Sequence, residues 1–162
     1  MTIQFASFQP KFKVYKKILP NGLTILVKPT NQIPRVETHL WYNVGSKDEN
    51  YNERGMAHLL EHMLFKGTKN LSESDINAIC QKLTADANAF TSQDYTCYTF
   101  RLPSNVWKVG LELLAECMQN ATFKPQMLAS EVKTVIEELR MYRENFQGTL
   151  LEEMIGSLFT DH

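Results

Sequence analysis

The sequence lacks long hydrophobic runs. No apolar stretch reaches the roughly 18 residues that a membrane-spanning helix requires, and residues 1–17, MTIQFASFQPKFKVYKK, contain no apolar segment of signal-peptide length. We therefore expect a cytoplasmic protein that does not insert into a membrane. A periplasmic or organellar location stays open for a chain that has been trimmed.

The sequence also has few cysteines and no excess of charge of either sign. Cys80, Cys97 and Cys117 are odd in number, widely spaced and without a CxxC pair, which argues against a disulfide framework and a thiolate zinc cluster. We expect reduced, mostly buried thiols. The formal net charge of −1 gives no electrostatic reason to expect a nucleic-acid or anionic-membrane partner.

The composition is that of an ordinary globular protein, with 43% hydrophobic and 22% charged residues. A length of 162 residues suits one domain with one core, and no low-complexity linker or repeat divides the chain. We therefore expect a single domain over residues 1–162. Because the sequence stops on TDH without a helix-capping signal, we expect it to be the N-terminal part of a longer protein.

Turn signals and hydrophobic periodicity predict both strands and helices. The PNG turn at 20–22 separates two β-rich runs, 12–19 and 23–28, which indicates a hairpin. Further strands are expected at 35–44, 84–90 and 95–102. Helices are expected at 56–64, from the SESD start at 72–75 onward, at 104–120, at 125–145, and after the FQG at 146–148.

The segment HLLEH, residues 58–62, places two of the four histidines one helical turn apart. On a helix, His58 and His62 lie about 40° apart, and Glu61 lies about 60° to the other side of His58. The three polar side chains therefore share one sector. The apolar residues of the opposite sector are expected to pack into a core: Met56, Leu59, Leu60 and Met63.

This spacing is suited to zinc chemistry. Two neutral imidazoles at i and i+4 can both reach one ion at about 2 Å, and a neighbouring unbound glutamate can take a proton from water that the metal activates. The order HxxEH is the reverse of HExxH and gives an equivalent arc of side chains. Two alternatives stay open, namely paired surface histidines beside a charge or one hydrogen-bonded core histidine.

A catalytic zinc usually takes three protein ligands, so a third must come from elsewhere. The long helix carries four glutamates that could supply it: Glu131, Glu137, Glu138 and Glu144. Relative to Leu128, the stripe expected to be buried comprises Val132, Val135, Leu139, Tyr142 and Phe146. Glu138 and Glu131 lie about 80° and 60° from its centre, whereas Glu137 and Glu144 point to solvent. For Glu138 and Glu131, periodicity alone favours two roles equally: metal binding, or a structural position at the boundary between the buried and exposed faces of the helix.

These segments resemble the insulinase and mitochondrial-processing-peptidase family of zinc metallopeptidases, also called the pitrilysin family. The resemblance runs from about Asn21 to Asn145. It rests on NGLTILV, on NVGSKDE followed by GMAHLLEHMLFKGT, on ANAFTSQDYTCYTF and on EVKTVIEELRMY. With the predicted elements, it implies an α+β fold in which an antiparallel sheet has helices packed on one face.

The resemblance also assigns roles to individual residues. It implies that His58 and His62 are zinc ligands, that Glu138 is the third ligand and that Glu61 is the general base. Glu131 matches the acidic partner near the third ligand and belongs to the catalytic group. The helical wheel selects the same two glutamates of the long helix.

Peptides are the substrates that the resemblance implies, held as an added β-strand along an edge at Asn88, Ala89 and Phe90. An edge strand offers unpaired backbone groups to any extended peptide. By residue type alone, Asn88 suits a turn and Phe90 a core. The resemblance implies tandem domains that close around a chamber. C-terminal domains of the same protein are therefore expected partners. A homo-oligomer is a further possibility. The resemblance does not predict hydrolysis by this chain alone.

We therefore interpret the sequence as a zinc-dependent metalloendopeptidase domain. One alternative is an S-ribosylhomocysteine-lyase-like enzyme, which shares the HxxEH helix but takes a cysteine as third ligand, here Cys97 or Cys117. Another is a non-catalytic subunit of a peptidase-like complex. The NAFTSQDYTCY and EVKTVIEEL segments argue against the lyase. The HxxEH motif, in which every position is present, argues against the non-catalytic subunit.

Overall fold

The computed structural model describes residues 13–30 and 32–159. Its contacts divide the chain into two compact units, one that ends at Pro34 and one that begins at Arg35. Residues 1–12, which include most of the segment assessed for a signal peptide, lie outside the described residues. Among the described residues, no helix is both long and apolar enough to cross a membrane.

The first unit contains the predicted hairpin. Strands β1 (Tyr15–Ile18) and β2 (Thr24–Val27) pair antiparallel, with Tyr15 opposite Val27. Gly22 in the connecting turn has φ +88°, a conformation that glycine adopts without steric cost. The PNG signal is therefore confirmed as a hairpin turn.

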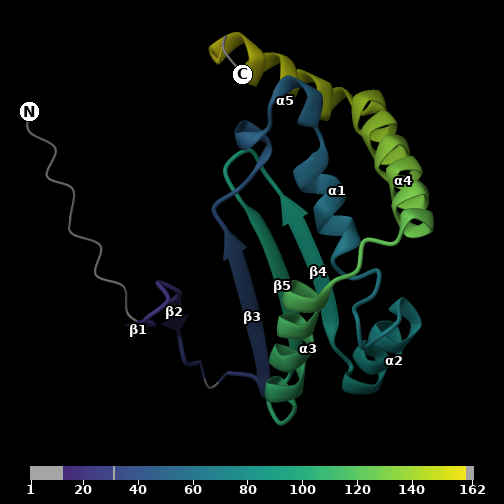
Figure 1. Cartoon of the computed structure of the whole chain (residues 1–162). Helices are drawn as coiled ribbons and strands as arrows, with labels where there is room; N and C mark the ends of the chain where they lie inside the picture. The colour runs from purple at the N-terminus through teal and green to yellow at the C-terminus, as the bar shows by residue number, and fades with distance from the viewer. Residues whose placement is uncertain (1–12, 31, 160–162) are drawn as a thin grey trace, which may run out of the picture. The chain divides into compact units, whose positions relative to one another are not determined.

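The second unit is built on a three-stranded antiparallel sheet. It comprises β3 (Arg35–Tyr42), β4 (Asp86–Thr91) and β5 (Thr96–Pro103), in the order β3-β5-β4. Trp41 and Phe90 are the partners of Cys97 on either side, and β5 lies between its two neighbours in Figure 1. Because β5 is central, β4 is an edge strand of this sheet.

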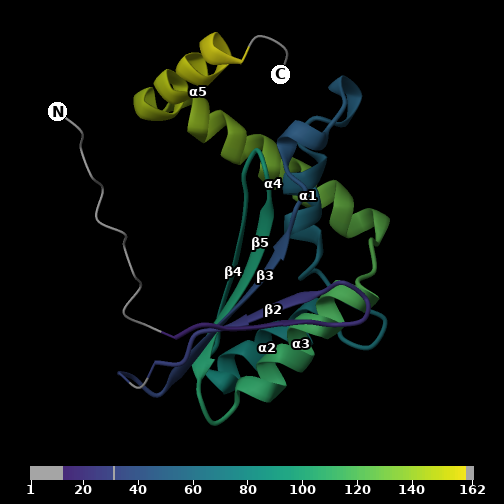
Figure 2. The same cartoon turned by 90° about the vertical axis from the view of Figure 1, so that its left-hand side faces the viewer.

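Among the described residues, five α-helices follow the predicted pattern, with two short 3-10 turns before them. They are η1 (Ser46–Asp48), η2 (Tyr51–Glu53), α1 (Met56–Met63), α2 (Glu73–Leu83), α3 (Trp107–Asn120), α4 (Pro125–Glu144) and α5 (Phe146–Leu158). Figure 2, which turns the sheet towards its edge, shows α2 and α3 on the same side of it. The predicted α+β fold, with helices on one face of an antiparallel sheet, is confirmed.

The core lies between β5 and helices α2 and α3. Alternate residues Tyr98, Phe100 and Leu102 of β5 turn to one face, as the period of a strand requires. They pack with residues from the end of α1, from α2 and from α3: Leu64, Ile76, Leu113, Leu114 and Cys117. Burial of these side chains holds the sheet against the helices, and β4 is held by its pairing with β5.

Several predicted boundaries were wrong. Helix α5 begins at Phe146 instead of after FQG, because the Asn145 side chain accepts hydrogen bonds from the backbone N–H groups of Gln147 and Gly148 and so caps the helix. Strand β4 begins at Asp86 instead of 84, because Thr84 ends α2 in the left-handed region at φ 49°. Helix α3 begins at Trp107 instead of 104.

Burial on two helices also departs from the prediction. On α1, Met63 is buried as expected, but Met56 and Leu60 are exposed and Glu61 is buried. On α4, only Val135 of the expected stripe is buried. Its other members are exposed: Leu128, Val132, Leu139, Tyr142 and Phe146. The elements that α4 chiefly contacts are α1 and α5, so most of its apolar stripe is not covered by the sheet.

Candidate metal centre

Helix α1, which carries the two motif histidines, begins at a point fixed by a distant carboxylate. Gly55 occupies the N-cap at φ +90°, and Glu49 accepts hydrogen bonds from the N–H groups of Gly55 and Ala57 at 2.8 and 2.6 Å. An anion at this end of a helix satisfies free donors and opposes the helix dipole. Glu49 was not predicted as a site residue, because it lies outside the helix that it caps.

Three donor atoms meet where α1 faces α4. The Nε2 atoms of His58 and His62 are 3.2 Å apart. Glu138 Oε2 of α4 lies 3.4 Å from each of them. The side chains of His58 and Glu138 keep 32% and 46% of their surface exposed, so the triangle of atoms is accessible from solvent.

This triangle has the dimensions of a tetrahedral zinc site. With bonds of about 2.0–2.2 Å, neighbouring ligand atoms around tetrahedral zinc lie about 3.3–3.6 Å apart. The separations of 3.2 and 3.4 Å between the three donors are close to that range. Among the described residues, His58, His62 and Glu138 form the group whose donor atoms could hold a metal ion. Three donors leave a fourth position open, as in catalytic zinc sites.

Glu131 of α4, which was selected from the sequence, contacts the Nδ1 atom of His62, on the side of the ring away from the triangle. Its buried carboxylate places Oε2 3.2 Å from His62 Nδ1. Burial raises the pKa of Glu131, but hydrogen bonds from Lys66 and His62 outweigh it and lower the pKa overall. An ionised carboxylate only accepts, so the contact places the proton of His62 on Nδ1 and leaves the Nε2 lone pair facing the triangle.

Lys66 lies beside the site and was not predicted from the sequence. Its Nζ lies 2.8 Å from Glu131 Oε1 and 2.9 Å from Glu73 Oε1. Burial lowers the pKa of Lys66, but its hydrogen bonds to the two glutamates raise it overall. Lys66 follows the end of α1 and is distant in sequence from Glu131, so no periodic signal relates them.

Glu61 is buried and does not belong to the triangle. Thr91 Oγ1, at the end of β4, donates to Glu61 Oε2 at 2.5 Å. Thr91 in turn lies 3.4 Å from Thr96 Oγ1, which donates to the carbonyl of Val44 at 3.0 Å. A line of hydroxyls from the sheet therefore orients this carboxylate, and sequence patterns gave no indication of it.

The residues proposed for substrate binding lie on edge strand β4. Asn88 and Phe90 are exposed, whereas Ala89 packs against the core. The interpretations of Asn88 as a turn residue and Phe90 as a core residue were wrong, because both belong to a strand and face away from the core. Phe90 is 44% exposed and makes edge contacts with Trp41 and Tyr95 at centroid distances of 5.8 and 6.2 Å.

The remaining candidates lie away from the triangle. Glu137 and Glu144 are exposed, as predicted. Cys97 and Cys117 are fully buried in β5 and α3, and burial raises the pKa of each thiol to about 11. Neither cysteine belongs to the donor group found among the described residues.

Comparisons with known proteins agree on one family. The family model described as insulinase (peptidase family M16) matches residues 24–161. An uncharacterized zinc protease of Rickettsia bellii is 34% identical over 143 residues, which cover 88% of this chain and 35% of that protein. The beta subunit of mitochondrial-processing peptidase from Blastocladiella emersonii is 28% identical over 153 residues, 94% of this chain and 32% of the subunit.

A solved structure shares the fold. The crystal structure of a protease from Helicobacter pylori superposes with a TM-score of 0.76 and 33% sequence identity, over 82% of this chain and 32% of that one. The chain therefore spans about a third of the length of the curated relatives it matches.

Proposed function

The chain belongs to the insulinase family, peptidase family M16, and we propose that it supplies the zinc site of a metalloendopeptidase. In this proposal His58, His62 and Glu138 hold the ion. The observation that carries it is the triangle of donor atoms, whose sides of 3.2 and 3.4 Å suit one tetrahedral zinc. Relatives named zinc protease support the same metal.

Glu61 is the general base of the proposed reaction. Zinc bound at the triangle would supply a Lewis acid for the scissile carbonyl and lower the pKa of water. Glu61 takes the proton from the attacking water and passes it to the leaving amine. Thr91 donates a hydrogen bond to Oε2 of Glu61, which leaves Oε1 as the atom that accepts the proton.

Peptides are the proposed substrates, held along the free edge of β4. The backbone of Asn88, Ala89 and Phe90 would pair with an extended peptide, as strand addition requires. The strand ends at Thr91, which contacts Glu61, so a peptide on this edge runs toward the general base. The peptidase would then have little preference for the sequence of its substrate, because pairing between backbones does not depend on the side chains.

Further domains of the same protein are proposed partners. The curated relatives are about three times as long as the region they share with this chain, which supports additional domains that complete the substrate chamber. Assignment of residues 1–162 to one N-terminal zinc-binding domain stays a prediction, as does a homo-oligomer. Peptidase activity is therefore best assayed on the longest natural form of the protein.

The lyase alternative loses support from the position of the cysteines, since Cys97 and Cys117 are buried apart from the donor triangle. We expect Cys97→Ser and Cys117→Ser to retain zinc. The non-catalytic alternative is not favoured either, because each proposed ligand and the proposed base are present.

Metal content tests the ligand set. We expect elemental analysis of the purified chain to give about one zinc per molecule and Glu138→Ala to give much less. Glu137→Ala is the matched control, because Glu137 neighbours Glu138 on α4 but pairs with Arg140 and is not one of the three donors. Equal zinc in the wild type and in Glu138→Ala would remove Glu138 from the ligand set.

A further inference from the structure

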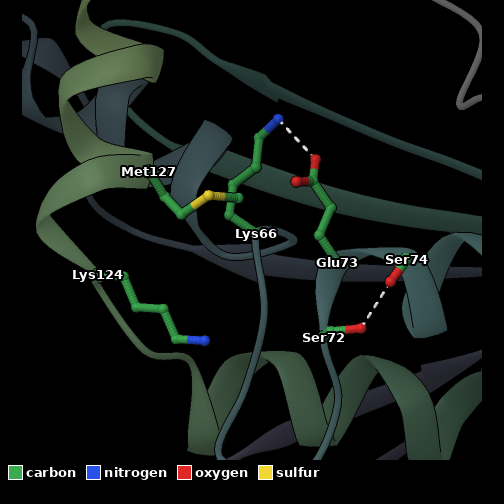
Figure 3. A pocket seen from close by; sticks show the side chains of 6 residues that line it. All are labelled: Lys66, Ser72, Glu73, Ser74, Lys124 and Met127. Atoms are coloured by element: carbon green, nitrogen blue, oxygen red, sulfur yellow. Dashed lines mark hydrogen bonds and ion pairs between the residues drawn. The ribbon is translucent and has the colours of Figure 1, made fainter.

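Lys66 connects three helices beside the proposed zinc site. Its backbone N–H donates to the carbonyl of Met63 at the end of α1. Its ammonium reaches Glu131 of α4 and Glu73 in the first turn of α2, at 2.8 and 2.9 Å. Figure 3 shows the Lys66 side chain extended toward Glu73.

Glu131 has both oxygens occupied in this arrangement. Oε2 accepts from His62 Nδ1, and Oε1 accepts from Lys66 Nζ. The residue is only 6% exposed, so water replaces neither partner easily. A buried carboxylate that loses its cationic partner moves toward solvent. That movement would remove the acceptor that orients the His62 ring.

We propose that Lys66 is a positioning residue for His62 and acts through Glu131. The inference rests on the proposed zinc site. The ammonium holds the Glu131 carboxylate at a fixed place, and that carboxylate then accepts the hydrogen bond from His62 Nδ1. The Nε2 lone pair is thereby kept toward His58 and Glu138, which lie 3.2 and 3.4 Å away. Partners that orient a metal-binding histidine typically change metal affinity by about 10–100-fold when they are removed.

Variants of the full chain test this role by zinc affinity, measured by competition with a chromophoric chelator. Lys66→Met removes the ammonium and is expected to weaken zinc binding by about tenfold or more. Lys66→Arg restores the cation and is expected to restore affinity. The larger guanidinium has room, because Lys66 borders a cavity of about 280 Å³ that Glu73 and Lys124 also line.

Glu73→Gln is the matched control. It removes the other ion pair of the same lysine and leaves the contact with Glu131 in place, so we expect near wild-type affinity. A loss as large as that of Lys66→Met would show that the attachment of α2, and not the support of Glu131, causes the effect. That result would overturn the proposal.

A double-mutant cycle tests the route through Glu131. If Lys66 acts through that carboxylate, Lys66→Met adds little to the loss of zinc affinity already caused by Glu131→Gln. Fully additive losses would contradict the proposal. Circular dichroism and denaturant unfolding on each variant exclude misfolding as the cause.

The tautomer of His62 is a measurement that would not change if Lys66 had only a structural role. In the metal-free chain at neutral pH, ¹⁵N NMR is expected to show His62 protonated on Nδ1 in the wild type and in Lys66→Arg, and a mixture of tautomers in Lys66→Met. An unchanged tautomer together with unchanged zinc affinity in Lys66→Met refutes the positioning role. A wild-type chain that binds no zinc refutes the proposed function instead, and the NMR comparison still decides the role of Lys66.

Discussion

The carboxylate of Glu138 lies 3.4 Å from Nε2 of His62, and this contact joins α4 to α1. The same oxygen lies 3.4 Å from Nε2 of His58. One acceptor thus faces two imidazole nitrogens across a gap that zinc would span with ordinary bond lengths. Glu131 and Lys66 support the arrangement from the buried side, while the side that bears His58 and Glu138 stays accessible. The donor atoms are therefore supported by the buried Glu131 on one side and are open to solvent on the other.

Glu61→Gln separates metal binding from hydrolysis. Glu61 is not one of the three donors, so we expect the variant to keep the zinc content of the wild type. An amide does not accept the proton, so we expect peptide hydrolysis by the longest form of the protein to fall by about 10²–10⁴-fold. Elemental analysis and a peptide cleavage assay are run on the same sample. A variant that retained the normal rate would refute the role of Glu61 as base.

Thr91→Val removes the hydroxyl that donates to Glu61 and keeps the shape of the side chain. The buried carboxylate oxygen then lacks its partner, which we expect to lower the free energy of unfolding by about 1–3 kcal/mol. Thr99→Val is the control, because Thr99 donates only a longer, 3.3 Å bond to the carbonyl of Asn88. Equal losses in urea unfolding of the two variants would argue against a special role of Thr91.

The three thiols are expected to differ in reactivity. Burial raises the pKa of Cys97 and Cys117 to about 11 and raises that of the half-buried Cys80 as well. The thiolate is the reactive form, so a raised pKa leaves little of it at pH 8. We expect iodoacetamide to label Cys80 first and the other two only after denaturation, as read by mass spectrometry. Rapid native labelling of Cys97 or Cys117 would contradict their burial.

The start of α2 is expected to give the chain a pH-dependent stability. Asp75 accepts from the side chain and backbone N–H of Ser72, the N-cap, and these hydrogen bonds lower the pKa of Asp75. A lowered native pKa adds stability above the unfolded value and loses it as the pH falls through the native value. Asp75→Asn is therefore expected to be less stable than the wild type at pH 7, with a smaller difference near pH 3. A difference that grew in acid would contradict this assignment.

Local spacing in the sequence was enough to place the motif. The i and i+4 positions of His58 and His62 bring their rings to one side of α1, and the helical wheel selected Glu138 over Glu137 on α4. The hairpin at Gly22 and the alternation of β5 were equally local signals. Each of these depends on a period that the chain itself displays.

Contacts between distant segments were not predictable in the same way. Lys66 with Glu131, and Thr91 with Glu61, join residues whose proximity is set by the packing of whole elements, and no periodicity relates them. The wheel also assigned α4 a broad buried stripe, yet Leu139 and Tyr142 are exposed because α1 and α5 cover only part of that helix. Amphipathicity shows which face can be buried, and only the fold shows what covers it.

The most direct test of the zinc site is an anomalous difference map, collected at the zinc absorption edge from crystals of the zinc-loaded chain. We expect one strong peak about 2.0–2.2 Å from Nε2 of His58, Nε2 of His62 and the carboxylate of Glu138. A zinc peak held by other residues, or crystals that take up no zinc at these three donors, would contradict the account.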